Sequence, residues 1–572
     1  MVNLKINGIA VSVPEGSTIL QAAKLANVRI PTLCYLKEIQ CIGSCRMCLV
    51  EATGARGLVA ACVYPVSEGM EVRTNTPKVR KSRKTTLELI LSTHKKKCLS
   101  CVRSMNCELQ KLALEYNAEE DKFGTDHDIK PIDDLSPSVV RDNSKCIMCT
   151  RCVAACEKQT IGAIGPKNRG YAKTIGSPFD VSLAHTTCVN CGQCVVACPV
   201  GALYEKSSVA DVWGAIVDPT KKVVFFTAPS VRATLGEAFG LPVGTNVEGK
   251  MVTAIKQLGD VQCFNMDTTA DLTIMEEANE LLDRLKNGGK TPMFTSCCPG
   301  WIKFCEHYYP EFLPNLSTCK SPQEMFSAVL KTYYCKKNNI DPKDLYVVSV
   351  IPCTAKKFEV TREELGNYTD SAITTRELAK MIKEAGVDFA NLSDTPYDDP
   401  FGLASGAGAI FGATGGVMEA ALRTVAETVT GEKLENIDFK AVRGTKGIKE
   451  ATLTLAGKQI NICVASGLGN ARKIMDDIKA GKSKYHFIEI MACPGGCVNG
   501  GGQPIVDSKT RNLVDVAKTR AKVLYSKDRK DALRKSHDNP VVKTLYDEYF
   551  QKPNSHVAHE VLHTSYVARK KY

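Results

Sequence analysis

The chain has 572 residues, of which 44% are hydrophobic and 24% charged, so it can bury several ordinary cores, and its composition excludes a disordered or fibrous protein. Its formal net charge of +12 would by itself favour a nucleic-acid partner, but this figure counts every thiol as neutral, and metal-bound cysteines are thiolates. The unusual number is 26 cysteines, so the real charge depends on what they bind.

The first residues show no export signal. Met1–Ala10 alternates polar and apolar residues and carries Lys5, with no apolar h-region or cleavage site behind it. We therefore expect a cytoplasmic location, where grouped cysteines bind metal more often than they form disulfides. The longest uncharged run, Phe401–Met418, has six glycines among its eighteen residues, so no membrane span is expected.

Residues 1–76 form the first predicted domain. A hairpin turning at Asn7-Gly8 is expected at Val2–Ile6 with Ile9–Val13, followed by a helix that Ser17 caps and that runs to about Ala26, and by a late strand at Met70–Thr74. Four cysteines follow the spacing C-x10-C-x2-C-x13-C, namely Cys34, Cys45, Cys48 and Cys62. This pattern resembles the β-grasp ferredoxins of plant and mitochondrial type, in the variant at the front of large redox enzymes, which implies a 2Fe-2S cluster. Cys41 lies outside the pattern.

Residues 77–118 form a short, basic, helical segment with a second set of ligands. His94, Cys98, Cys101 and Cys107 follow the pattern H-x3-C-x2-C-x5-C. One imidazole and three thiolates also suit structural zinc, and composition alone leaves both metals open. The segment resembles the His-ligated segment of respiratory complex I and related enzymes, which implies a 4Fe-4S cluster.

Residues 119–208 contain an internal repeat. The run C-x2-C-x2-C-x3-C occurs twice, 42 residues apart, at Cys146, Cys149, Cys152 and Cys156 and at Cys188, Cys191, Cys194 and Cys198. This is the run of bacterial two-cluster ferredoxins, in which the fourth cysteine of each run binds the other cluster. We therefore expect two 4Fe-4S clusters, with Cys198 completing the first and Cys156 the second.

Residues 209–572 read as a larger α/β region. Strand-like runs are expected at Val223–Thr227, Met293–Thr295, Leu345–Ile351 and Phe487–Ala492, and helices at Ile274–Lys286 and Gln323–Cys335. Such alternation predicts a largely parallel sheet covered by helices, so the whole chain is multidomain, α+β and α/β. Each strand runs into a motif rich in Pro, Gly or Cys, and ligands collect beyond the carboxyl ends of parallel strands. The motifs are therefore expected to converge on one anionic cofactor.

Three long motifs carry a resemblance that covers the whole chain. They are TSCCPGW at Thr295–Trp301, PCTAKKFE at Pro352–Glu359 and MACPGGCVNGGGQP at Met491–Pro504. Together they resemble the signature sequences of the FeFe (iron-only) hydrogenases, and the modules in front of them resemble the large monomeric clostridial type with accessory iron-sulfur domains. The resemblance implies a two-lobed α/β catalytic domain and the activity of a ferredoxin hydrogenase, which reversibly reduces protons to H2 with electrons from reduced ferredoxin.

The resemblance also implies the cofactor, called the H-cluster, and its ligands. Cys298, Cys353, Cys493 and Cys497 would hold a 4Fe-4S cubane, and Cys497 would also bridge to a di-iron subcluster with carbon monoxide, cyanide and a bridging dithiolate amine. Donors to cyanide would be Lys356 and Ser230, with Gln323 as a nearby polar contact. One departure is Ile351, where many relatives have a flexible, polarisable methionine.

A proton relay is implied as well. Cys297 precedes a cubane ligand and would pass protons to and from the di-iron unit, and Glu277, Ser317, Glu280 and Arg284 would lead to solvent. Glu277, Glu280 and Arg284 are spaced i, i+3 and i+7, so they share one helix face. An ordinary solvated helix face has the same spacing. The remaining isolated cysteines read as small buried side chains, and the scattered histidines stay unassigned.

The expected clusters change the net charge of the protein and therefore the class of partner that it suits. Five thiolate-held clusters contribute about −9, which brings the loaded protein to roughly +3 and removes the reason for nucleic-acid binding. The basic run Lys78–Lys84 with Lys95–Lys97 is either a solvated face or a patch that steers an acidic ferredoxin or flavodoxin. No flavin or nicotinamide motif is recognised, so electrons are expected from a protein donor, and the di-iron unit from separate maturation proteins.

Three rival functions share parts of these patterns. A hydrogen or redox sensor usually has an added signalling domain, and none is recognised here. An iron-sulfur assembly protein loses the relay cysteine or the motif around it, whereas this chain has Cys297, Lys356 and the complete GGGQP ending. A complex I-type subunit would leave the last 360 or so residues unexplained.

Overall fold

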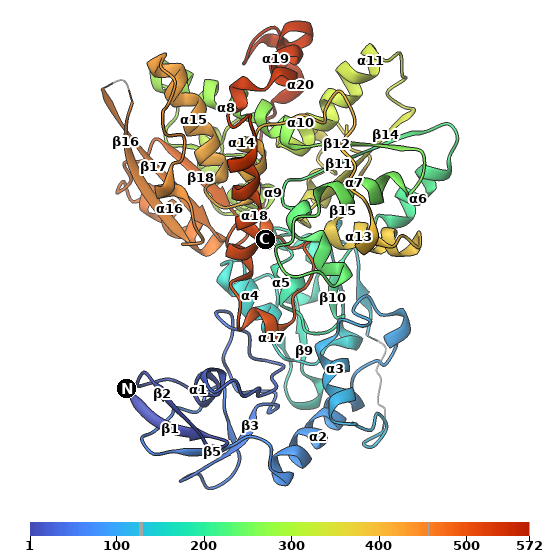
Figure 1. Ribbon diagram of the computed structural model, residues 1–572, viewed down its shortest axis with the longest axis vertical. Helices are drawn as coiled ribbons and strands as arrows, with labels where there is room; N and C mark the ends of the chain where they lie inside the picture. The colour runs from blue at the N-terminus through green and yellow to red at the C-terminus, as the bar shows by residue number, and fades with distance from the viewer. Residues whose placement is uncertain (125–129, 456, 571–572) are drawn as a thin grey trace.

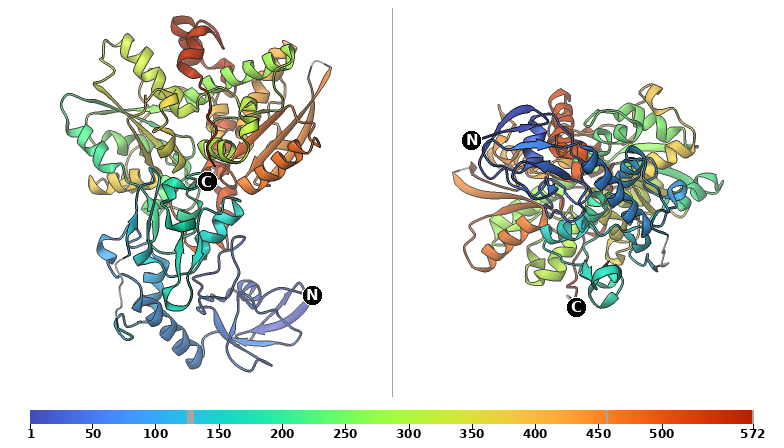
Figure 2. Two further views of the ribbon diagram at one scale, coloured as in Figure 1. Left: turned by 180° about the vertical axis from the view of Figure 1, so that it is seen from behind. Right: turned by 90° about the horizontal axis from the view of Figure 1, so that it is seen from below.

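The cysteine-rich modules and the α/β region occupy opposite ends of an elongated molecule (Figure 1). The structure is a computed structural model that describes residues 1–124, 130–455 and 457–570. Residues up to about 120 lie at one end, the two-run cysteine unit lies in the middle, and the rest of the chain forms the other end (Figure 2). Among the described residues, no helix combines the length and apolar character needed to cross a bilayer.

The first unit is a five-stranded sheet with one helix packed on it. Its strand order is β2-β1-β5-β3-β4, with β1 Val2–Ile6, β2 Ile9–Val13, β3 Leu49–Ala52, β4 Val59–Ala60 and β5 Glu71–Arg73. Helix α1, Ile19–Leu25, begins one residue later than predicted. Its cap is Thr18, not Ser17, because the Thr18 hydroxyl accepts from the Gln21 N–H while the Gln21 side chain accepts from the Thr18 N–H.

The next segment is helical, as predicted, and is docked on the first sheet. It contains α2, Pro77–Ser92, and α3, Glu108–Glu115. The buried Arg83 of α2 donates to the Leu49 carbonyl at 2.7 Å and to the Tyr116 hydroxyl at 3.1 Å. These bonds fix the helix between β3 and the residue that follows α3, so the two units share an interface.

The middle unit is small and nearly repeats itself. Its strands are β6 Ile132–Asp133, β7 Val139–Asp142 and β10 Leu203–Glu205 in the order β10-β7-β6, with a separate hairpin of β8 Gly165–Lys167 and β9 Thr174–Gly176. Each cysteine run leads into a short helix, α4 Arg151–Lys158 or α5 Gln193–Ala197, and these two helices pack together. The repeat in sequence thus becomes a repeat in structure.

The C-terminal region has two four-stranded sheets, where a single largely parallel sheet was expected. In the first, β12-β11-β14-β15, all strands are parallel: β11 Lys222–Thr227, β12 Val261–Asn265, β14 Leu345–Ile351 and β15 Ser371–Thr374. The second has the order β13-β18-β17-β16, with β13 Met293–Phe294, β16 Ile448–Leu455, β17 Lys458–Ser466 and β18 Phe487–Met491. Its edge strand β16 is antiparallel to β17. The predicted strands therefore divide between two sheets.

Helices cover both sheets. In chain order they are α6 Val209–Val217, α7 Glu248–Lys256, α8 Asp267–Asn287, α9 Pro299–Tyr308, α10 Pro322–Val329, α11 Cys335–Lys337, α12 Ala355–Glu359, α13 Thr375–Glu384, α14 Gly406–Ala409, α15 Gly416–Thr430, α16 Leu468–Lys479, α17 Ser508–Arg511, α18 Val516–Lys530, α19 Pro540–Leu545 and α20 His556–Leu562. The predicted helix Gln323–Cys335 changes to a π-helix at Leu330–Tyr334, between α10 and α11.

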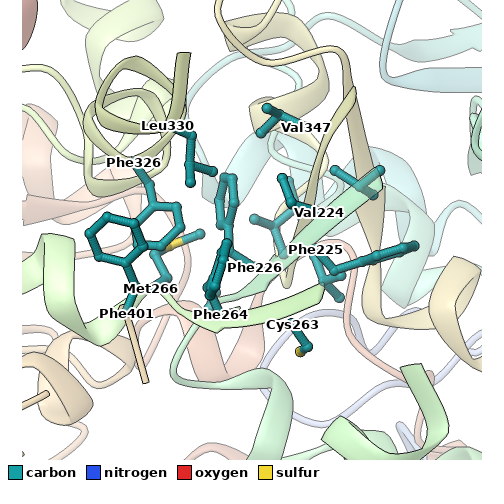
Figure 3. Close-up of a cluster of buried hydrophobic side chains, with 14 of the residues drawn as sticks. Val224, Phe225, Phe226, Cys263, Phe264, Met266, Phe326, Leu330, Val347 and Phe401 are labelled. Carbon is teal, nitrogen blue, oxygen red and sulfur yellow. The ribbon is translucent and has the colours of Figure 1, made fainter. Parts of the chain in front are cut away.

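Aromatic packing holds α10 against the first sheet. Figure 3 shows Phe226 of β11, Phe264 of β12 and Phe326 of α10 meeting in one cluster, and the Phe226 and Phe326 ring centroids are 4.7 Å apart. All three side chains are fully buried. Burying each ring contributes about 1.5 to 3 kcal/mol, so this cluster fixes the carboxyl ends of β11 and β12 and the helix α10, which carries Gln323.

Candidate active site

Three strand ends deliver the motif cysteines to one cavity. Cys297 and Cys298 follow β13, Cys353 follows β14, and Cys493 and Cys497 follow β18. All five cysteines line the same cavity. Since β13 and β14 belong to different sheets, the cavity lies where the carboxyl ends of the two sheets meet. The predicted convergence is therefore present.

The rest of the lining is mostly apolar. Met266, Ala270, Ile351, Phe411 and Met491 supply apolar surface. The polar lining residues include Ser230 and Lys356, the expected cyanide donors, and Gln323, the expected nearby polar contact. An apolar cavity wall with a few hydrogen-bond donors suits a compact metal group that carries small polar ligands.

The four expected cubane ligands are neutral thiols unless a metal holds them. Burial is the main cause that raises the pKa of each, to about 12 for Cys353 and well above the usual range for Cys493. Their mutual repulsion adds to this effect. The Ala492 N–H donates to the Cys298 sulfur at 3.4 Å, as backbone amides do toward cluster thiolates. Four buried sulfurs fit iron-sulfur or zinc chemistry, so the ligand set alone leaves both metals open.

Lys356 is held by a residue that the sequence analysis did not single out. Its Nζ lies 2.7 Å from Oε2 of Glu359, one turn along α12. Burial acts to lower the pKa of Lys356, but the charge of Glu359 and its hydrogen bond outweigh it, so the pKa is raised and the ammonium stays charged. Glu359 belongs to the PCTAKKFE motif, whose spacing could have shown this i, i+3 pair.

Ser230 and Gln323 are likewise held by neighbours. Gln503 donates to the Ser230 hydroxyl at 3.2 Å and to the Cys497 carbonyl at 3.1 Å, which ties one proposed donor to one proposed ligand. The Gln323 amide donates to Glu359 at 3.1 Å and accepts from Ser349 at 2.7 Å. Gln503 stands in the GGGQP ending, but nothing in the sequence indicated its partners.

The outer part of the predicted relay is a continuous hydrogen-bonded chain. The Ser317 hydroxyl donates to Glu280 Oε2 at 2.8 Å, and Arg284 donates to Glu280 Oε1 at 2.6 Å. Arg284 also donates to the Leu316 carbonyl at 2.7 Å. The Tyr566 hydroxyl donates to the Ser317 carbonyl at 2.9 Å and so fixes this residue from the C-terminal tail.

The inner part is interrupted at Glu277. Among the described residues, neither oxygen of this fully buried carboxyl group makes a regular hydrogen bond, although the Ser317 hydroxyl and the Ser296 N–H lie close enough to act on its pKa. Burial raises the pKa of Glu277 to about 8, the charge of Glu280 acts in the same direction, and Ser317 opposes it. The pKa of Cys297 is raised well above its usual value, first by burial and then by Glu277. At neutral pH both groups therefore hold a proton.

The accessory cysteines gather in the expected sets. In the first unit the Cys48 and Cys62 sulfurs are 3.4 Å apart, and the Cys34 and Cys45 sulfurs each accept the other residue's N–H at 3.4 Å. One cavity is lined by His94, Cys98, Cys101 and Cys107. Another is lined by Cys146, Cys149, Cys152 and Cys198, so the fourth cysteine of the second run does cross to the first. Exposed Cys41 donates to the Cys62 carbonyl at 2.7 Å.

The cysteine loops touch one another from unit to unit. Gln40 donates to the carbonyls of Cys34 and Cys149, at 3.0 and 2.7 Å, and so joins the first unit to the middle one. A Cβ added at Gly201 would lie 2.5 Å from the Cys101 sulfur. The His94 segment therefore also lies directly against the middle unit.

The closest contact joins the middle unit to the main cavity. A Cβ added at Gly501 would lie 2.3 Å from the Cys191 carbonyl, and one at Gly192 would lie 2.4 Å from the Thr354 hydroxyl. The Thr354 hydroxyl donates to the Asn190 carbonyl at 2.6 Å. Only glycine permits this approach, which brings the Cys191 loop against the Cys353 motif.

A buried lysine lies at the same junction. Lys303 of α9 donates to the Asn190 side chain at 2.7 Å. Burial lowers the pKa of Lys303 to about 8, while the nearby Cys188 acts to raise it. A cluster on Cys188 is negative and would keep this lysine charged. Neither Asn190 nor Lys303 was singled out from the sequence, because their partners are distant in the chain.

Comparison with known families agrees with this geometry. Residues 221–501 match the model of the iron only hydrogenase large subunit, C-terminal domain, and residues 514–569 match the iron hydrogenase small subunit. In front of these, residues 1–77 match a 2Fe-2S iron-sulfur cluster binding domain, 83–122 the NADH-ubiquinone oxidoreductase-G iron-sulfur binding region and 145–202 a 4Fe-4S dicluster domain.

Individual relatives extend the similarity to the full length. The chain is 47% identical to the NADP-reducing hydrogenase subunit HndD of Solidesulfovibrio fructosivorans, over 100% of both chains. It is 45% identical to iron hydrogenase 1 of Clostridium pasteurianum, over 99% of this chain and 100% of that one. A cytosolic iron-sulfur assembly component 3 from Rattus norvegicus is 30% identical over 67% of this chain and 83% of that one.

A solved structure covers the C-terminal region. The apo FeFe-hydrogenase HydA1 from Chlamydomonas reinhardtii matches with a TM-score of 0.57 and 40% identity, over 64% of this chain and 99% of that one. Fold, motifs and relatives define an iron-sulfur oxidoreductase that acts on hydrogen. The chain belongs to the FeFe hydrogenase family, in its large form with accessory iron-sulfur domains.

Proposed function

We propose that the cavity holds an H-cluster whose cubane is bound by Cys298, Cys353, Cys493 and Cys497, with Cys497 bridging to a di-iron unit that carries carbon monoxide, cyanide and a dithiolate amine. The observation that supports this most is that four cysteines from three distant motifs line one buried cavity in a chain of this family. When bound, the H-cluster supplies the iron chemistry that interconverts protons and H2. Zinc would fill the four sulfurs but leave the apolar part of the cavity without a function.

The protein's own groups then hold ligands and move protons. Lys356, kept charged by Glu359, and Ser230, kept in place by Gln503, would donate to cyanide. Cys297 would pass a proton to Glu277, and Ser317, Glu280 and Arg284 would carry it to solvent. The raised pKa of Glu277, about 8, keeps it protonated at neutral pH and close to the point of exchange.

Residues 1–208 would receive electrons from the donor and pass them toward the main cavity. We propose domains at 1–76, 77–118, 119–208 and 209–572: a β-grasp ferredoxin with one 2Fe-2S cluster, a His-ligated 4Fe-4S segment, a bacterial two-cluster ferredoxin and a two-lobed α/β domain. The contacts at Gln40, Gly201 and Gly501 support transfer between neighbouring clusters. Maturation proteins that deliver the di-iron unit, and a cytoplasmic location, complete the proposal.

The electron donor is proposed to be an acidic ferredoxin or flavodoxin. A second arrangement, in which this chain is one subunit of a larger enzyme, is favoured by its full-length similarity to a protein named as an NADP-reducing hydrogenase subunit. The two can be separated with the isolated chain. Turnover with reduced ferredoxin would support the first, whereas turnover only after a nucleotide-oxidising partner is added would support the second.

Metal analysis and infrared spectroscopy test the cofactor proposal together. Matured protein should contain about 20 irons and show carbonyl and cyanide bands, and protein without the di-iron unit should contain about 18 and show neither. One zinc with four fewer irons would contradict the cluster at His94. Four sulfurs of the main cavity filled by zinc would contradict the H-cluster.

A further inference from the structure

A second group of metal-binding side chains lies at the outer end of the proton relay. Cys319 and His563 form an isolated antiparallel bridge, which the bonds Lys320 N–H to Leu562 carbonyl and Thr564 N–H to Thr318 carbonyl, both 2.8 Å, hold in place. Glu280 of α8 approaches the pair. One ligand atom from each of Glu280, Cys319 and His563 lies within 4.8 Å of the other two.

The His563 imidazole is oriented for this group. Its Nε2 lies 3.0 Å from Oε2 of Glu276, and its Nδ1 lies 2.8 Å from the Thr318 hydroxyl. Glu276 is fully buried and also accepts from the Tyr546 hydroxyl at 2.5 Å. Since this carboxylate accepts from Nε2–H, the lone pair is on Nδ1. A carboxylate behind a histidine is the arrangement that orients imidazole ligands in metal sites.

The charge around the thiol also favours a cation. Burial raises the pKa of Cys319 well above its usual value, and Glu280, Glu277 and Glu276 add to the effect. Arg284 is bonded to Oε1 of Glu280 at 2.6 Å, whereas the Cys319 thiol donates to the other oxygen, Oε2. A divalent cation bound by the Cys319 thiolate and the Glu280 carboxylate would cancel both negative charges.

We propose that Glu280, Cys319 and His563 bind a divalent cation of the zinc class, and that the bound cation inhibits the enzyme by taking Glu280 out of the proton relay. Binding releases the Cys319 proton to solvent and forms bonds to Sγ, Nδ1 and a carboxylate oxygen, with water as the fourth ligand. This mixture of sulfur, nitrogen and oxygen suits Zn2+ or Cd2+ and disfavours Mg2+ and Ca2+.

The required movement is small. Ligand atoms around tetrahedral zinc are about 3.3 to 3.8 Å apart, given the usual bond lengths, so the three side chains must close by roughly 1 Å. The Glu280 side chain is 12% exposed, which gives the cation a way in. Metal binding through Nδ1 replaces the 2.8 Å hydrogen bond between His563 and the Thr318 hydroxyl, and the Glu280 oxygen that binds the metal gives up its 2.8 Å hydrogen bond from Ser317. The inhibition rests on the proposed relay, whereas the binding does not.

Binding is tested first without turnover. Protein with its iron-sulfur clusters but no di-iron unit is incubated with Zn2+, desalted and examined by metal analysis and zinc-edge X-ray absorption. We expect one zinc per chain with one sulfur and the remaining neighbours nitrogen or oxygen. Cys319→Ala and His563→Gln should each lose this zinc. Cys335→Ala, which removes another buried cysteine outside the group, should keep it.

Inhibition is tested separately in matured protein. With Zn2+ at ten times its dissociation constant, hydrogen evolution should fall about tenfold in the parent and the Cys335→Ala variant and recover with a chelator. Cys319→Ala should keep the same rate with and without Zn2+. Zinc without a sulfur neighbour, or equal zinc in Cys319→Ala, would overturn the site. Zinc bound with one sulfur but no change in rate would overturn the inhibition and leave the site standing.

Discussion

The main cavity is approached from two sides that are built in opposite ways. On the cluster side, Gly192 and Gly501 bring two cysteine loops into backbone contact, with no side chain between them. On the solvent side, α8 and the segment around Ser317 supply a line of acidic and hydroxyl side chains. The cluster side keeps the two cysteine loops close together, whereas the solvent side supplies many groups that can hold a proton.

This difference follows from what is transferred. An electron passes between clusters without needing a chain of bonds, so the best design is to remove side chains and shorten the gap. A proton must be handed between donors and acceptors about 2.6 to 3.2 Å apart, so it needs side chains in sequence. In the proposed relay, the gap at Glu277 is then the point at which proton transfer can be controlled, and the proposed cluster side has no equivalent.

The largest effect is expected at Cys297. Cys297→Ser keeps all four proposed cubane ligands but replaces a thiol with a hydroxyl that gives up its proton far less readily. Hydrogen turnover should drop by orders of magnitude while iron content and carbonyl bands persist, and Cys297→Asp should recover part of it. Cys298→Ser, the adjacent control, should lose iron and activity together. Near-normal turnover in Cys297→Ser would mean that protons reach the cavity by another route.

On the cluster side, Gly501→Ala should act by pushing the two cysteine loops apart. Its added Cβ would meet the Cys191 carbonyl and the Gly192 Cα, at 2.3 and 2.6 Å, and both are backbone atoms that cannot rotate away. We expect a loss of about 1 to 3 kcal/mol in stability and slower reduction of the accessory clusters by H2. Gly214→Ala, where nothing lies within 4 Å, is the matched control. Equal electron transfer in both variants would contradict the contact's role.

The buried carboxyl of Glu277 should make stability depend on pH. Its folded-state pKa of about 8 lies above the unfolded value of roughly 4.3, so the folded state holds an extra proton between them. Its contribution to stability is therefore full below about pH 4 and is lost as pH rises toward 8. The melting temperature of Glu277→Gln should fall less between pH 5 and pH 9 than the melting temperature of the parent. If the melting temperatures of the two proteins fall equally with pH, the pKa of Glu277 lies near its ordinary value.

The smallest effect is expected at Lys303. Its ammonium lies beside the Cys188 loop and should favour the reduced, more negative cluster. Lys303→Met should lower that cluster's reduction potential by on the order of 1 kcal/mol, or roughly 40 mV. Lys473→Met, at an exposed position on α16, makes the same charge change in solvent and should shift the potential less. Redox titration followed by electron paramagnetic resonance measures both.

Local patterns could be predicted from the sequence and pairings between distant segments could not. The hairpin at Asn7-Gly8 and the cysteine runs were predicted because their geometry depends on a few adjacent residues. The alternation of strands and helices indicated a largely parallel sheet, but it did not show which strands share a sheet, because strand order is decided by packing and not by the strands' own residues.

The site shows the same limit. The five cysteines that line the cavity were singled out because each stands in a dense motif, but the residues that hold the proposed donors could not be recognised. Gln503 reaches Ser230 from 273 positions away. Cys319 and His563, which the sequence analysis treated as a small buried side chain and an unassigned histidine, become a pair through a backbone bridge. Neither segment carries a periodicity or spacing that points to the other.

The bond from Tyr566 to the Ser317 carbonyl sets an order of events during synthesis. The two residues are 249 positions apart, and His563 reaches Thr318 across a similar span. At about 5 to 20 residues per second, a ribosome needs roughly 12 to 50 s to add that stretch. The nascent cysteine modules can fold within that interval, whereas Ser317 waits for its fixing partner. The proposed electron-transfer modules can thus form before the proposed proton relay has all its partners.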